Sequence, residues 1–334
     1  MIIKRKQHKT PGRRIGVNDA GYVCPRFNLE SRRLAWLKSI RSAGSRVAAT
    51  AVFSPKSWRD AYGSLAGPER VLIAMYETEI YDLMPQFNGL RVVQLTDIHH
   101  GPWLPIEFVD AIVEKTNNLK PDIVALTGDY VVNSERYIGP VARALGKLTP
   151  TIGTFAVMGN HDWWEGGHEM IDALAQEKIH VIDNDRVIIT PSREVVPAAR
   201  AGLCIAGVGD PWADVVDFDA ALHGVPPHVP RLLLSHNPDC AEDRNFLRSS
   251  YRVDLMLSGH THGGQVCFPA TRQPVLPKIR KNKYARGLVF GPRCPVYISR
   301  GIGTAGVPLR LAADPEIAVF DLVSSAGQSV NGKY

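Results

Sequence analysis

The chain has 334 residues, of which 45% are hydrophobic and 22% charged, a balance that is typical of folded globular proteins and excludes wholesale disorder. Its 29 glycines and 24 prolines favour a fold rich in loops and exclude a collagen or a coiled coil. The formal net charge of +6 is concentrated in two stretches of the chain, which argues against a general nucleic-acid-binding surface.

The first of these stretches is a basic N-terminal arm, which we place at residues 1–67. Residues 1–50 hold twelve lysines and arginines against two acids, which leaves 27 basic and 31 acidic residues in the rest of the chain. A helix in this arm would put five apolar residues on one face, an arrangement that suits an anionic membrane surface. A solvated, disordered arm fits the composition equally well. The five residues are Leu34, Leu37, Ile40, Ala43 and Val47.

The arm also bears on where the protein works. Arg32 and Arg33 resemble the pair of a twin-arginine export signal, but their spacing is one residue off and Arg41 and Arg46 interrupt the following stretch. No run approaches the roughly 18 uncharged apolar residues of a spanning helix. We therefore expect a cytoplasmic protein, with peripheral attachment to the inner membrane or export as alternatives.

Residues 68–323 are expected to form one catalytic domain, and residues 324–334 a flexible tail. Apolar runs and helical periodicities alternate along most of this domain, whereas the last strands are not separated by helices. This pattern predicts an α/β (α+β) fold of mixed sheets with helices outside. Strands are expected at 70–81, 91–96, 122–127, 151–158, 179–182, 186–189, 203–208, 231–235, 253–258, 265–268, 295–299 and 316–322, and helices at 105–119, 134–148, 169–178, 217–223 and 239–247.

Metal-ligating side chains follow five of these strands directly, where each strand ends. Since the carboxyl ends of parallel strands meet at one edge of a sheet, we expect the side chains to face one crevice. Any one of these motifs alone is weak evidence, but their ordered occurrence is not. They are Asp97 and His99, Gly128-Asp129, Gly159-Asn160-His161-Asp162, His236, and Gly259-His260-Thr261-His262.

This set of side chains has the composition of a centre for two metal ions. Carboxylates and a carboxamide offer hard oxygen ligands, imidazoles favour transition metals, and no thiolate is present. Two cations about 3.5–4 Å apart can clamp both the attacking and the departing oxygen of a phosphoryl displacement. The cofactors should be two divalent ions, and Mn, Fe, Zn or Co all accept these ligands.

These motifs resemble those of the calcineurin-like metallophosphoesterases. The segments 95–101, 234–239, 258–265 and 299–306 resemble more narrowly the bacterial phosphodiesterase branch that includes a UDP-2,3-diacylglucosamine hydrolase. The resemblance covers about residues 88–322 and not the arm. It implies a four-layer αββα sandwich of two mixed β-sheets flanked by helices, with the di-metal site at the strand C-terminal ends.

The resemblance also implies a role for each motif residue. One metal would be held by Asp97, His99 and His262, the other by Asn160, His236 and His260, and Asp129 would bridge both. His161 would face the scissile phosphate and stabilise or protonate the leaving oxygen, while Asp162 would orient its ring. A hydroxide bridging the two metals would be the nucleophile.

The second basic stretch lies beside these motifs. Residues 255–313 contain no acid and nine lysines or arginines. Guanidinium groups suit phosphate oxygens, so Arg300 and Arg310 are candidates for substrate binding, as is His100. The substrate would be a phosphodiester or pyrophosphate, small or lipid-linked, at an anionic membrane surface. Two alternatives remain open: a nuclease, although no nucleic-acid-binding module is visible, and a metal-stabilised binding module without catalysis.

Overall fold

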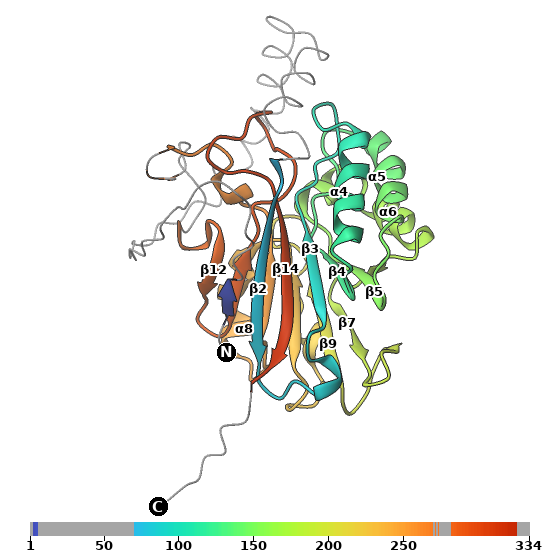
Figure 1. Ribbon diagram of the computed structural model, residues 1–334, viewed down its shortest axis with the longest axis vertical. Coiled ribbons are helices and arrows are strands. Elements are labelled where there is room, and N and C mark those ends of the chain that lie inside the picture. Colours follow the sequence, from blue (N-terminus) through green and yellow to red (C-terminus); the bar gives the residue numbers. More distant parts are fainter. Residues whose placement is uncertain (1–2, 6–69, 270, 272, 274–281, 326–334) are drawn as a thin grey trace, which may run out of the picture.

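Two seven-stranded β-sheets form the centre of the molecule. The computed structural model describes residues 3–5, 70–269, 271, 273 and 282–325 (Figure 1). The predicted helix of the arm, its twin-arginine pair and most of the predicted tail lie outside the described residues.

The first sheet is mixed, with the strand order β1-β2-β14-β3-β4-β5-β6. Strands β3 to β6 run parallel, β14 is antiparallel to β3, and β1 is antiparallel to β2. The bounds are β1 (Ile3–Arg5), β2 (Leu72–Ile80), β3 (Arg91–Leu95), β4 (Ile123–Leu126), β5 (Gly153–Ala156), β6 (His180–Val181) and β14 (Glu316–Ser324).

The second sheet is also mixed, with the order β12-β13-β11-β10-β9-β7-β8. Strands β9, β10, β11 and β13 are parallel, and β7 and β12 pair antiparallel at the two sides. The bounds are β7 (Asp185–Ile189), β8 (Val195–Val196), β9 (Leu203–Val208), β10 (Arg231–Ser235), β11 (Leu255–Ser258), β12 (Gly287–Phe290) and β13 (Pro295–Ile298).

Helices cover the outer face of each sheet. Helices α4 (Ile106–Asn118), α5 (Ile138–Leu145) and α6 (Asn160–Gln176) lie together outside β3, β4 and β5 (Figure 1). The second sheet is covered by the short helices α7 (Phe218–Leu222) and α8 (Arg244–Arg248). Single 3₁₀ turns are η3 (Pro85–Phe87), η4 (Glu135–Tyr137), η5 (Pro238–Glu242), η6 (His262–Gly264) and η7 (Asn282–Tyr284).

Strand alternation explains the layers. In β10, Leu232 and Leu234 face the core between the sheets, whereas Leu233 faces the core under α7 and α8. In β3, Val92 lies between the sheets and Val93 lies under the helices of the first sheet. Because successive side chains of a strand point to opposite faces, a sheet buried on both faces is apolar throughout. The four-layer αββα prediction is thus confirmed.

Three predicted elements differ from the structure. The helix expected at 169–178 begins at Asn160. Gly166, with a φ of 142°, kinks it, and the Gly166-Gly167 pair obscured the first turns in the sequence. The helix expected at 239–247 is divided into η5 and α8, because Asp243 is extended and caps the second piece.

The strand expected at 265–268 is wrong. The segment turns instead: Gln265 has a φ of 50°, its N–H donates to the His262 carbonyl, and pairing is limited to isolated bridges, such as that of Val266 with Leu311. Strands β1, β8 and β12 were not expected. The part of the chain that the structure describes has no helix with the length and apolar character to cross a membrane.

Candidate metal centre

The exits of β3, β4, β5, β10 and β11 come together at one edge of the two sheets, and they carry the side chains expected to bind metal. Three overlapping groups have ligand atoms within 4.8 Å of one another: Asp97, His99 and His262; His99, Asp129 and His161; and Asp129, His236 and His260. The structure thus brings together residues 163 positions apart in the chain, as the strand-exit argument predicts.

The first group is compact and buried. The Nε2 atoms of His99 and His262 lie 3.0 Å apart, and His262 Nε2 is 3.3 Å from Asp97 Oδ1. Two nitrogen ligands at a Zn–N distance of about 2.0–2.1 Å lie roughly 3.0–3.4 Å from each other. The observed spacing therefore suits ligands that share one cation.

The second group has the same spacing. His236 Nε2 lies 3.2 Å from His260 Nδ1 and 3.2 Å from Asp129 Oδ2. The other ring nitrogen of His236 is 2.8 Å from the Thr127 carbonyl, a contact that favours hydrogen on Nδ1 and leaves the Nε2 lone pair toward the centre. Asn160 is buried beside these groups, and its Oδ1 atom has no hydrogen-bond partner.

One carboxylate oxygen joins the two groups. Asp129 Oδ2 lies 3.4 Å from His99 Nε2 and 3.2 Å from His236 Nε2, whereas Asp129 Oδ1 accepts the His161 backbone N–H at 2.8 Å. A single oxygen within reach of both histidine groups is the geometry that a bridging ligand requires.

The backbone at these positions is strained. Left-handed backbone is unfavourable for residues other than glycine by about 1–2 kcal/mol, and such outliers gather at functional sites. Here it turns side chains from separate strand exits toward one point. Positive φ values occur at Asp97 (49°), His99 (48°), Asp129 (58°), His260 (69°) and His262 (53°).

Glycines allow the loops to approach one another. A Cβ atom at Gly128 would lie 2.9 Å from Nδ1 of His236, and one at Gly259 would overlap Thr96 and Asp97. Side chains at these two positions would push the groups apart, which is why glycine precedes Asp129 and His260.

The electrostatics of the first group also suit a cation. Burial raises the pKa of Asp97 to about 7 and lowers that of His99 to about 3. Burial likewise lowers the pKa of His262 well below its usual value. The imidazoles are therefore neutral, with lone pairs available, and a cation would stabilise a buried carboxylate. The residues present fit a centre of two divalent ions.

Comparison with known families agrees with this geometry. Residues 90–264 match the model of the calcineurin-like phosphoesterases, a segment that spans β3 to η6 and holds every residue of the three groups. The chain belongs to the calcineurin-like phosphoesterase family. The resemblance seen in the sequence is thereby confirmed, and with it a phosphoester hydrolase that uses a dinuclear centre of divalent metal ions.

Several relatives are similar over most of the chain. An uncharacterized metallophosphoesterase of Helicobacter pylori is 34% identical over 301 residues, 88% of this chain and 73% of the relative. The phosphodiesterase YaeI of Escherichia coli is 32% identical, over 70% of this chain and 82% of its own. A transmembrane protein with metallophosphoesterase domain from Danio rerio is 31% identical over 77% of this chain, which spans 58% of that protein.

The resemblance implies that Asp162 orients the His161 ring, but the structure shows its carboxylate engaged with other groups. Its buried carboxylate accepts backbone N–H groups instead: Oδ2 from Asp129 at 2.7 Å and Gly159 at 2.9 Å, and Oδ1 from Tyr130 at 2.7 Å. Asp162 therefore ties the loop after β4 to the start of α6. It positions the backbone that carries Asp129 and Asn160.

Replacing Asp162 by Asn should lower the free energy of unfolding by about 3 kcal/mol, because an amide NH₂ would face buried N–H donors. The measurement is urea unfolding. Asp172→Asn, an exposed change in the same helix, is the control and should be neutral. Equal stability of the two variants would contradict the positioning role.

Two of the three residues expected to contact the substrate bind backbone carbonyl groups of the protein instead. His100 is buried, and its Nδ1 pairs with the Leu104 carbonyl at 2.8 Å. The Arg310 guanidinium donates to the carbonyls of Gly303, at 2.8 Å, and Arg300, at 2.8 Å, and lies 3.3 Å from His262 Nδ1. These contacts stabilise the loops and do not support phosphate binding.

The Arg300 side chain has fewer polar contacts than that of Arg310. It has one ion pair, 3.5 Å from Glu316, and its side chain is 17% exposed. Its stem packs on Gly263, next to His262. Of the three residues, Arg300 stays the candidate for an anionic substrate group.

Asp210 is a further buried carboxylate at a strand exit, and it was not predicted from the sequence. It follows β9 as Gly209-Asp210, the pattern that marked Asp129 after β4, and β9 is the neighbour of β10. Its carboxylate is buried, with Oδ1 accepting the Trp212 N–H at 2.8 Å and Oδ2 without a hydrogen-bond partner. The same Gly-Asp signal could have found it.

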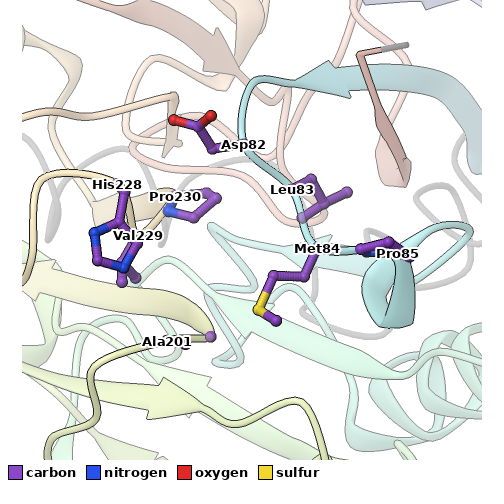
Figure 2. Close-up of a pocket in the computed structure, with 9 residues that line it drawn as sticks. Asp82, Leu83, Met84, Pro85, Ala201, His228, Val229 and Pro230 are labelled. Atoms are coloured by element: carbon purple, nitrogen blue, oxygen red, sulfur yellow. The ribbon is translucent and has the colours of Figure 1, made fainter. Parts of the chain in front are cut away.

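A pocket of about 330 Å³ lies at the opposite edge of the sheets, away from the metal-binding groups. Figure 2 shows it between the segment after β2, which carries Asp82 and Met84, and the loop before β10, which carries His228. Asp82 is paired with Arg252 at 2.9 Å, and His228 Nε2 lies 2.8 Å from the Arg200 carbonyl. Because its polar groups are engaged, the pocket offers no second reactive centre.

Proposed function

We propose that this protein is a phosphodiesterase or pyrophosphatase in which Asp129 bridges two divalent metal ions. Asp97, His99 and His262 would hold one ion, and Asn160, His236 and His260 the other. The observation that carries the proposal is the position of Asp129 Oδ2 between His99 and His236. Ions bound there would supply Lewis-acid polarisation of the phosphoryl oxygens and an acidified water as the nucleophile.

His161 is proposed to act on the leaving oxygen. Its backbone is fixed by the N–H bond to Asp129, and its Nδ1 is buried without a hydrogen-bond partner. The ring lies edge-on to His99, with 4.9 Å between centroids, and is partly exposed, unlike the buried His99. The group is thus next to the metal site and open to substrate, as a general acid must be.

Hydrolysis of bis(p-nitrophenyl) phosphate by the full chain with added manganese is the direct test. We expect p-nitrophenolate release that requires the metal and is lost with a chelator. No release with manganese, iron, zinc or cobalt would contradict the proposal. A non-catalytic binding module would bind metal without turnover, whereas a nuclease would prefer a DNA or RNA strand to this small diester.

A lipid-linked substrate, such as a UDP-diacylglucosamine, is the finer proposal. Leu309 and Leu311 are exposed large apolar side chains on either side of Arg310, which contacts His262. Apolar groups exposed beside the metal site could accommodate an acyl chain. The basic arm would add attraction to an anionic bilayer.

Vesicle binding tests the membrane part of this proposal. The full chain should sediment with vesicles that contain anionic lipid, and Arg32→Glu/Arg33→Glu should weaken this binding by about 30-fold or more, since each of the two basic groups near the surface contributes about 1 kcal/mol. Arg244→Glu/Arg248→Glu changes the charge equally on α8 and serves as the control. If the full chain sediments equally with neutral and with anionic vesicles, the arm has no part in membrane binding.

A further inference from the structure

Two tryptophans flank the metal-binding groups on the side open to solvent. Trp164 packs edge-on against His161, with 4.9 Å between ring centroids, and Trp212 packs edge-on against His260, at 4.4 Å. His161 and the expected ligand His260 are partly exposed, whereas the remaining expected ligands are buried. The two indoles therefore border the approach to the centre.

These side chains remain exposed although they are large and apolar. Trp164 is 38% exposed and Trp212 is 36% exposed. A substrate whose phosphate reaches the centre would cover part of both indoles. Exposed aromatic surface beside a reactive site is the usual form of a binding contact.

The backbone under both indoles is well fixed. Trp164 lies in the first turns of α6, before the kink at Gly166. The Trp212 N–H donates to Asp210 Oδ1 at 2.8 Å, and Asp214 N–H donates to the Asp210 carbonyl at 2.7 Å. One indole comes from the helices of the first sheet and the other from a loop of the second. Fixed walls from both sheets lose little entropy when a ligand binds.

From this arrangement we infer that Trp164 and Trp212 form an aromatic rim that selects phosphoesters with a planar aromatic group, such as a nucleobase or an aryl ester. The inference rests on the proposed function, because the phosphate must bind the metal ions. A planar ring that packs on an indole gains more binding free energy than an aliphatic group of similar area does. Stacking of a base on an aromatic side chain contributes about 1–3 kcal/mol.

Binding of two phosphonates of similar size to the metal-loaded full chain tests the rim without catalysis. Phenylphosphonate is planar and cyclohexylphosphonate is not, and calorimetry gives both dissociation constants. We expect about tenfold tighter binding of phenylphosphonate. The ratio of the two dissociation constants should fall toward one in Trp164→Leu and in Trp212→Leu. It should return toward the wild-type value in Trp164→Phe and Trp212→Phe. Tyr81→Leu, a change of an exposed aromatic residue directly after β2, is the control and should keep the preference.

Hydrolysis of bis(p-nitrophenyl) phosphate by the same preparation separates the two proposals. Hydrolysis together with equal affinity for the two phosphonates would overturn the aromatic rim alone. A wild-type preference that the Leu variants retain would also overturn it. Absence of hydrolysis would overturn the proposed function and the inference that rests on it.

Discussion

Asp129→Asn is expected to lower the hydrolysis of bis(p-nitrophenyl) phosphate by about 1,000-fold or more. The change replaces a carboxylate between two histidine groups by a neutral amide and removes the charge that a bridging ligand provides to both ions. The ions stabilise the transition state by several kcal/mol, and the loss of that stabilisation corresponds to a rate loss of this size. Metal content, measured by elemental analysis after gel filtration, should fall below two ions per chain.

The control for this variant is Asp185→Asn, the same chemical change at an exposed position of β7. It should keep both metals and full activity. Two retained ions in Asp129→Asn would contradict the bridging role, and retained activity would contradict the whole centre. Since the Asp129 side chain also accepts the His161 N–H, circular dichroism should accompany the assay to show that the fold is intact.

Strand exits were predictable from the sequence because two local signals coincide. An apolar run of four to six residues predicts a strand buried on both faces, and a polar residue directly after it must lie at the sheet edge. Asp97, Asp129 and His236 follow this rule. The grouping of Asp97 with Asp129 required only the parallel order of the strands, which alternating helices indicate. His236 follows a strand of the second sheet, so its place beside them depends also on the packing of the two sheets.

Other features depend on contacts between distant segments and were not predictable. Asp162 has the sequence context of a catalytic neighbour, yet its partners are backbone N–H groups, and two of them, at Asp129 and Tyr130, are more than 30 residues away. Arg310 is basic and near the site, but carbonyls of folded loops engage it. Charge and motif position do not show which polar partner a side chain finds. The kink in α6 hid the position of Trp164 in the same way.

His161→Ala is expected to reduce kcat by about 10²–10⁴-fold with both metals retained, because a general acid contributes this much without holding the ions. The ring nitrogen lies within 4.8 Å of ligand atoms of His99 and Asp129, so metal content decides whether His161 is itself a ligand. His168→Ala, an exposed histidine of the same helix, is the control. Loss of one ion would make His161 a ligand and contradict its proposed role.

The leaving group gives a sharper test of the same role. If His161 protonates the departing oxygen, its removal should slow hydrolysis of a diester with a poor leaving group more than one with p-nitrophenolate, which departs readily without a proton. We therefore expect the loss of kcat in His161→Ala to be about tenfold larger for phenyl than for p-nitrophenyl esters of the same phosphate. An equal loss would favour charge stabilisation by the ring, because that contribution does not depend on proton transfer to the departing oxygen.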